Sequence, residues 1–160
     1  MKTKDEILAN RWIKPFAHRL THPSLWHVNR RSLSKALGLG LFAAFVVPIG
    51  QIVLAALLAI PTRANVPVAI GATFVTNPLT FGPIWYGAWW TGDHLLRPFG
   101  IESHPFDLSA GYAWSAVATM VPITLGLILF AVGSGLLGFL LARAWYTLRL
   151  TARWRARRAG

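Results

Sequence analysis

The polar side chains best placed to bind something lie inside apolar parts of this sequence, where hydrogen-bonding groups are scarce. Gln51 is the strongly polar residue of the first apolar stretch, and burying its amide unpaired in hydrocarbon costs roughly several kcal/mol. The second stretch adds threonines and an asparagine. The candidate polar site is Gln51, Thr73, Thr76, Asn77 and Thr80. Amides and hydroxyls can bind a ligand or cap helix ends, and because both uses involve the same atoms, the sequence leaves both open.

Side chains that could catalyse a reaction or hold a metal ion are sparse. The chain has five acidic residues, none paired within the apolar stretches, and no Cys nucleophile or Gly-rich phosphate loop. His18 and His22 stand four apart, but Pro23 ends a helix there, and a metal site needs three or four convergent ligands. His94 and His104 lack partners of that kind as well. We therefore predict that the protein is not an enzyme, holds no metal and uses no cofactor.

Three long uncharged apolar stretches carry the polar residues. Each matches or exceeds the roughly 20 apolar residues that cross a hydrocarbon core. Hydrophobic residues make up 54% of the chain and charged residues 13%, against about 25% charged in a typical soluble domain. The sequence predicts an all-α integral membrane protein with Pro-broken or re-entrant helices and basic amphipathic ends. Its expected parts are an interfacial segment 1–35, a membrane domain 36–142 with apolar elements 36–60, 64–90 and 108–142, and a cytoplasmic tail 143–160.

Prolines and a glycine interrupt the first two stretches. Pro48 removes a helical hydrogen bond, and Gly50 loosens the same turn. Pro78 disfavours helical geometry at Asn77, and Pro83 marks a further expected break. Since non-helical backbone at membrane depth must be buried in protein or line a wet cavity, we expect the interrupted regions to meet. Transporters build binding sites from such paired interruptions. The alternative is an ordinary kinked helix whose one amide side chain bonds to a neighbouring helix.

Basic residues gather towards the two ends of the chain, which has a formal net charge of +11. The positive-inside rule then places both termini in the cytoplasm and requires an even number of crossings. This holds if 36–60 dips into the bilayer and returns, which keeps Arg63 and Asn65 at a cytoplasmic entrance and leaves the acidic segment 91–107 outside. The alternative lets 36–60 span and folds the third stretch into a hairpin around Gly133.

The clustered arginines also indicate partners. Juxtamembrane cations attract anionic lipid headgroups, at about 1 kcal/mol per basic residue near the surface. The expected lipid contacts are Arg30, Arg31, Arg153, Arg155, Arg157 and Arg158. No zinc-ligand or aromatic RNA-binding signature accompanies the charge, so nucleic acid is not an expected partner. Small residues between Gly126 and Gly138 favour close helix contact or a homo-oligomer.

Several separate motifs occur in order between Trp26 and Gly92. They are Trp26 with Asn29-Arg30-Arg31, Gly38 to Phe42 followed by Pro48 and Gln51, Arg63-Ala64-Asn65, Thr76 to Thr80, and Gly82 to Tyr86. This set resembles the bacterial membrane proteins grouped as domain of unknown function 2062. The resemblance implies an integral, multi-pass protein of the bacterial inner membrane, with relatives that are sometimes fused to glycosyltransferase-like domains. It supplies no activity.

Two functions are compatible with these features. The first is transport of a small molecule or a lipid through a polar site at the broken helices. The second is a non-enzymatic membrane scaffold or assembly partner that holds an envelope or glycosyltransferase-type enzyme at the bilayer through its basic ends. The first makes the interrupted helices essential, whereas the second makes the basic tail essential.

Overall fold

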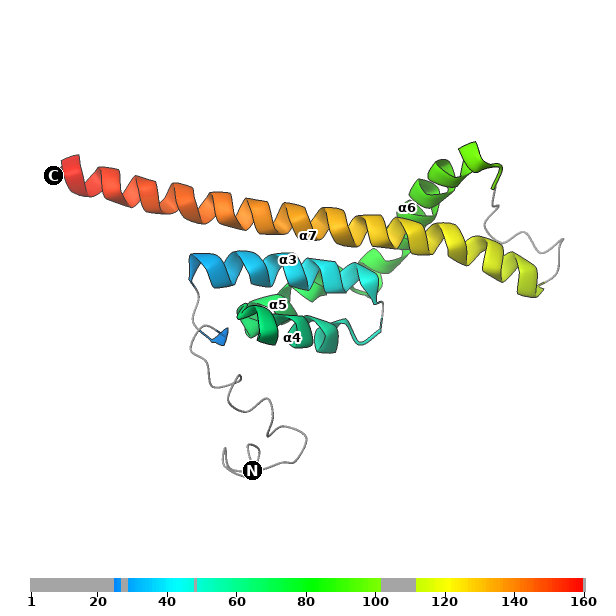
Figure 1. Ribbon diagram of the computed structural model, residues 1–160, viewed down its shortest axis with the longest axis horizontal. Helices are drawn as coiled ribbons and strands as arrows, with labels where there is room; N and C mark the ends of the chain where they lie inside the picture. Colours follow the sequence, from blue (N-terminus) through cyan, green and yellow to red (C-terminus); the bar gives the residue numbers. More distant parts are fainter. Residues whose placement is uncertain (1–24, 27–28, 48, 102–111, 160) are drawn as a thin grey trace, which may run out of the picture.

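The computed structural model describes residues 25–26, 29–47, 49–101 and 112–159, and this part of the chain is helical without a strand. The all-α prediction is therefore confirmed for the described residues. The elements are α3 (Arg30–Val46), α4 (Gln51–Thr62), α5 (Val66–Ala72), η2 (Thr73–Val75), α6 (Pro78–Leu96), η3 (Arg97–Phe99) and α7 (Tyr112–Ala159). Helix α7 is the longest and extends well past α3 at its C-terminal end (Figure 1). The expected N-terminal interfacial segment lies largely outside the described residues.

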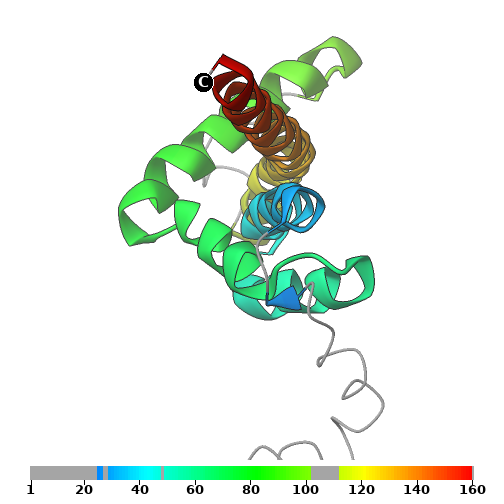
Figure 2. The ribbon, with the colours of Figure 1, turned by 90° about the vertical axis from the view of Figure 1, so that its left-hand side faces the viewer.

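Helix α3 is the central element of the fold. It begins at Arg30 because the Asn29 side chain caps it, accepting a hydrogen bond from the Ser32 amide at 2.8 Å. Figure 2 shows α3 between α7 on one side and the α4 and α5 pair on the other. The buried residues of α3 are all small: Ser32, Ser34, Ala36, Gly38, Gly40, Ala43 and Ala44. Small side chains let neighbouring backbones approach closely on two sides at once.

Helices α3 and α4 form a hairpin. The chain leaves α3 after Val46, and Gly50, with a φ of 82°, precedes α4 in the left-handed conformation that glycine tolerates best. At the open end of the hairpin, the end of α4 is held against the start of α3 because Lys35 Nζ donates to the Thr62 carbonyl oxygen at 2.8 Å. The predicted break at Gly50 is confirmed, while Pro48 lies outside the described residues.

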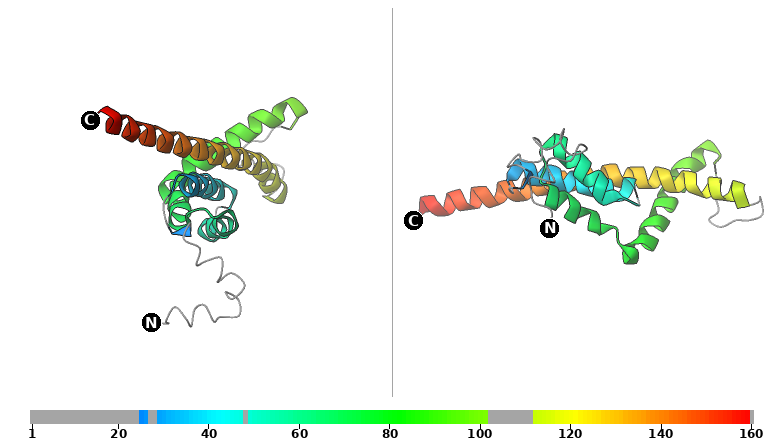
Figure 3. Two further views of the ribbon diagram at one scale, coloured as in Figure 1. Left: turned by 60° about the vertical axis from the view of Figure 1, so that its left-hand side comes forward. Right: turned by 90° about the horizontal axis from the view of Figure 1, so that it is seen from below.

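A bend separates η2 from α6, at the break predicted at Asn77 and Pro78. Pro78 is the first residue of α6, a position where its missing N–H is not needed. Figure 3 shows the corner that results and the oblique path of α6 towards α7. The break expected at Pro83 is wrong, since α6 continues through this residue to Leu96. Pro83 removes one helical hydrogen bond, and the flanking bonds hold the helix together.

Helix α7 runs antiparallel to α3 and is continuous. A Cβ added at Gly38 would meet the Gly135 carbonyl oxygen at 2.9 Å, and Phe45 meets Phe130 edge to face with ring centroids 6.0 Å apart. The alternative hairpin around Gly133 is therefore wrong. The same helix also passes through Pro122 without a break. Close helix contact, predicted for the small residues of this region, is confirmed within the chain.

Helix α6 packs on α7 through a second set of small residues. A Cβ at Gly92 would overlap the carbonyl of Pro122, and a Cβ at Gly126 would overlap the carbonyl of Ala88. These backbones touch because neither glycine carries a side chain. Helix α6 also includes Asp93, which the sequence analysis assigned to an outside loop. The helix extends that far because Asp93 pairs with Arg97 one turn later.

Large apolar side chains remain exposed along α7. Leu136, Leu137, Leu140 and Leu141 are each more than half exposed. The stretch Ala118–Arg149 (32 residues) is long and apolar enough to cross a membrane, and it is the one such helix in the described part of the chain. The second apolar stretch, 64–90, was expected as one apolar element with a break, and it is divided among α5, η2 and α6.

A test of the close contact between α6 and α7 compares two glycines of α7. Gly126→Ala places a methyl group against the Ala88 carbonyl, and overpacking of this kind costs about 1–3 kcal/mol. Gly133→Ala is the matched control, because nothing lies within 4 Å of its added Cβ. We expect a lower urea midpoint for Gly126→Ala and an unchanged or higher one for Gly133→Ala, followed by circular dichroism. Equal midpoints would contradict the contact.

Candidate functional site

Two of the polar residues predicted from the sequence, Gln51 and Thr76, meet at the joint between α4 and η2. Thr76 Oγ1 donates to Gln51 Oε1 at 2.6 Å, and Gln51 Nε2 donates to the Thr76 carbonyl oxygen at 3.4 Å. The Thr76 hydroxyl also lies 3.0 Å from the Thr73 carbonyl. Gln51 and Thr76, which are 25 residues apart in the sequence, thus bond to each other, as expected if the interrupted helices meet. We call Gln51, Thr73, Thr76, Asn77 and Thr80 the polar joint.

The remaining members of the polar joint cap helix ends. Asn77 Oδ1 accepts hydrogen bonds from the amides of Leu79 and Thr80, at 2.9 and 3.1 Å. Thr80 Oγ1 accepts in return from the Asn77 amide at 2.9 Å, which completes a capping box. Thr73 is buried, and its hydroxyl donates to the Ile70 carbonyl at 2.7 Å. These groups therefore use much of their hydrogen-bonding capacity within the protein.

A cavity of about 260 Å³ adjoins the polar joint. Its lining includes Gln51, Thr76 and Asn77 together with aromatic residues such as Phe81 and Trp85. No buried side-chain nitrogen or oxygen among the described residues lacks a hydrogen-bond partner. This geometry is what capping and helix-to-helix bonding require, which was one of the two interpretations left open. It leaves few polar atoms to hold a ligand.

A larger cavity, which was not expected from the sequence, lies at the other end of the α3–α4 hairpin. It has a volume of about 790 Å³ and lies between α3, the turn after α4, and α7. Arg31, Lys35 and Arg63 line it together with apolar residues that include Leu39, Phe42, Leu136 and Phe139. We call this the basic cavity. One feature of the sequence could have indicated this cavity, namely the basic residue Lys35 at the edge of an apolar stretch. Its hydrogen-bond partner Thr62 could not be identified from the sequence, because the α3–α4 hairpin brings the two residues together.

Arg63 enters the basic cavity through an unusual backbone conformation. It has a φ of 54° and a ψ of 40°, the one non-glycine residue with a positive φ among the described residues. The Arg63 amide bonds to the Ile60 carbonyl at 3.2 Å, and the Ala64 amide bonds to the Ala59 carbonyl at 2.9 Å. This is the glycine-favouring Schellman end of a helix. An L-residue other than glycine costs roughly 1–2 kcal/mol there.

Asn65 was expected with Arg63 at an entrance, and its side chain is buried. It is 1% exposed, its Oδ1 accepts from the Val68 amide at 3.0 Å, and it caps α5. Its own amide bonds to the Ser32 carbonyl at 3.4 Å, which ties α5 to the start of α3. Asn65 is therefore a structural cap, while Arg63 remains exposed at the basic cavity.

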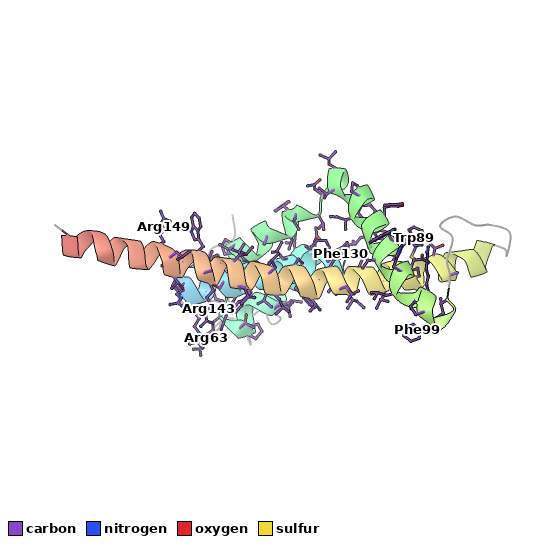
Figure 4. All side chains as sticks on the ribbon, turned by 90° about the horizontal axis from the view of Figure 1, so that it is seen from above. Arg63, Trp89, Phe99, Phe130, Arg143 and Arg149 are labelled. Atoms are coloured by element: carbon purple, nitrogen blue, oxygen red, sulfur yellow. The ribbon has the colours of Figure 1, made fainter. Side chains whose placement is uncertain are left out.

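Further cations surround the basic cavity. An adjoining cavity of about 530 Å³ shares Arg31, Lys35 and Phe139 with it and adds Arg30 and Arg143. Figure 4 shows Arg63 and Arg143 at one end of the molecule and Trp89 and Phe99 at the other. The side chains of Arg30, Arg31, Arg63 and Arg143 make no hydrogen bond or ion pair with the described part of the chain. The side chains of Arg153, Arg155, Arg157 and Arg158 lie outside it.

The acidic and imidazole groups lie away from the basic cavity. Asp93, the one acidic residue in the described part of the chain, is 1% exposed and accepts from Arg97 Nε at 2.8 Å. The His94 ring lies against Trp90, with ring centroids 4.2 Å apart and the ring planes tilted by 37°. No group of three or more potential metal ligands occurs among the described residues. His18, His22, His27 and His104 lie outside them.

The structure thus defines a class of all-helical proteins built around one central helix of small residues, with cations gathered at one end. Residues 13–155 match the bacterial family described as "Uncharacterized protein conserved in bacteria (DUF2062)". This match spans most of the chain, so the protein belongs to that family, and the resemblance seen in the motifs is confirmed. Neither the curated proteins nor the solved structures contain a match to this sequence.

The role of the polar joint can be tested on Thr76. Thr76→Val keeps the side-chain volume but leaves Gln51 Oε1 without its donor, which costs about 1–3 kcal/mol. Thr124→Val is the matched control, because Thr124 Oγ1 bonds only to the Met120 carbonyl of its own helix. We expect urea unfolding to show a loss for Thr76→Val and a change within about 0.5 kcal/mol for Thr124→Val. A stable Thr76→Val protein would remove the structural role of the joint.

Proposed function

We propose that the chain is a multi-pass protein of the bacterial inner membrane that binds and moves an anionic lipid or a related amphiphile. The observation that carries this proposal is the basic cavity, whose cationic rim and apolar wall suit a molecule with a charged head and a hydrocarbon tail. The exposed leucines of α7 and its length support a lipid environment.

The proposed topology has a re-entrant α3–α4 hairpin, one crossing made by α5, η2 and α6 together, and one crossing made by α7. Its support is that Arg30, Arg63 and Arg143, from three separate segments, gather at one end of the structure. Along α7, roughly 30 Å separates Pro122, beside Gly92 of α6, from Arg143 at 1.5 Å per residue. That distance equals a typical hydrocarbon thickness. In this arrangement both termini are cytoplasmic, as the positive-inside rule requires.

A lipid fits this protein better than a small polar solute. A path for a polar solute would need free hydrogen-bonding groups at the polar joint, whereas those groups bond largely to one another and to helix ends. In the basic cavity the arginine side chains are free of partners in the described part of the chain. In this proposal the ligand therefore binds at the basic cavity, and the polar joint has a structural role.

A scaffold for a membrane enzyme remains the second candidate. One observation favours it: α7 continues to Ala159, and its end projects past the rest of the fold (Figure 1). Trp145 and Leu148 are exposed on this projection, and Arg149 follows. A basic helix of this kind suits an acidic partner or the anionic surface of the membrane.

Movement of lipid across a bilayer separates the two functions. Vesicles containing the purified chain and a tail-labelled anionic phospholipid are treated with dithionite, which bleaches only the outer leaflet. We expect faster bleaching of the inner pool than in empty vesicles, a slower rate for Arg31→Ala because a rim cation is lost, and no change on removing 149–160.

Two outcomes of the vesicle assay count against this proposal. Folded protein that leaves the rate at the level of empty vesicles would contradict it. Loss of movement on removing 149–160, with Arg31→Ala unaffected, would place lipid movement at the projecting end of α7 and contradict a role for the basic cavity.

A further inference from the structure

We infer that the basic cavity selects an amphiphile whose headgroup is a phosphomonoester, and that Arg63 is a ligand of this headgroup. The inference rests on the proposed function, since it names the substrate class of the same site. Its basis is the backbone of Arg63, the charge around the cavity and the shape of its apolar wall.

Arg63 occupies a position where glycine is the favoured residue. Its left-handed backbone closes α4, and the same turn would form with glycine at less strain. The guanidinium makes no hydrogen bond or ion pair with the described part of the chain, so the arginine side chain adds nothing visible to the fold. Strain of this kind is typical of functional sites. The strained backbone places the Arg63 side chain at the rim of the basic cavity.

The charge at this rim suits a doubly charged head. Arg31, Lys35 and Arg63 line one cavity, and Arg30 and Arg143 line its neighbour, without an acidic side chain among the lining residues of either. Lys35 gives one hydrogen bond to the Thr62 carbonyl, which leaves two of its three donors. A phosphomonoester carries about −1.5 to −2 charges and three acceptor oxygens, and arginine binds it in a bidentate manner. A phosphodiester offers about half that charge.

The apolar wall requires a tail on the ligand. Leu39 and Phe42 of α3 face Leu136 and Phe139 of α7 along this wall, and Gly38 and Gly135 lie between them. A volume of about 790 Å³ exceeds what an inorganic phosphate fills, and much of the lining is apolar. A ligand with a phosphomonoester head and an apolar tail would therefore match both the cationic rim and the apolar wall of the cavity.

The test compares ligands of equal tail and different head, using the full chain in a neutral detergent and isothermal titration calorimetry. Short-chain phosphatidic acid should bind at least tenfold tighter than phosphatidylglycerol with the same chains, and tighter than inorganic phosphate by a similar factor. Arg63→Gly should weaken phosphatidic acid binding at least tenfold while its melting temperature stays equal or rises. Arg149→Ala, a cation outside both cavities, should bind like the wild type.

Each other outcome overturns a defined part of the inference. Equal binding of phosphatidic acid and phosphatidylglycerol would refute the phosphomonoester preference and leave the proposed function intact. Inorganic phosphate binding as tightly as phosphatidic acid would refute the amphiphile and point to a free anion. Arg63→Gly that binds like the wild type would remove Arg63 as a ligand. Failure of folded wild-type protein to bind any of the lipids would refute the proposed function as well.

Discussion

The structure depends on the close approach of backbones on two sides of α3. Gly38 lies against Gly135 of α7, and Gly40 lies against Ala69 of α5, so a single helix is packed between two others without large side chains. Packing of this kind gains dispersion contacts and needs no hydrophobic transfer, which is why it suits an environment of lipid. It also fixes the register of α7 against α3, and with it the positions of the arginines at the ends of both helices.

The two interruptions in the apolar stretches take different roles once α3 is central. The reversal at Gly50 folds α4 back along α3, and the Lys35 to Thr62 bond closes its open end, which creates the basic cavity. The bend at Asn77 lets α6 turn towards α7, and the bond between Gln51 and Thr76 joins this bend to the start of α4. One end of the α3–α4 hairpin is therefore tied to η2 by satisfied polar groups, and the other end presents cations around an apolar cavity. This division of roles underlies the proposal of a lipid site.

Much of this could be predicted from the residues. The glycines and prolines indicated the breaks at Gly50 and Pro78. The rule that non-helical backbone in a membrane must be buried in protein or line a wet cavity predicted that the interrupted regions would meet, as Gln51 and Thr76 do. The errors concern proline and charge inside helices: Pro83 lies within α6, and Asp93 extends that helix because Arg97 neutralises it. The basic cavity could not be found from spacing, because it joins residues of α3, the end of α4 and α7 that only the helix packing brings together. The left-handed backbone of Arg63 carries no signature in the sequence either, since glycine is the residue that marks such a turn.

The most direct measurement is cross-linking between pairs of introduced cysteines, which the absence of native Cys makes unambiguous. Cysteines at Arg31 and Arg63 line the same cavity, whereas Arg97 lies next to Asp93 on the α6 side of the fold. Treated with a short bismaleimide, the chain carrying cysteines at 31 and 63 should form an intramolecular cross-link rapidly, and the chain carrying them at 31 and 97 should not. If 31 and 63 fail to cross-link although each cysteine reacts singly, or if 31 and 97 cross-link equally well, then α3 does not bring the cations around one cavity.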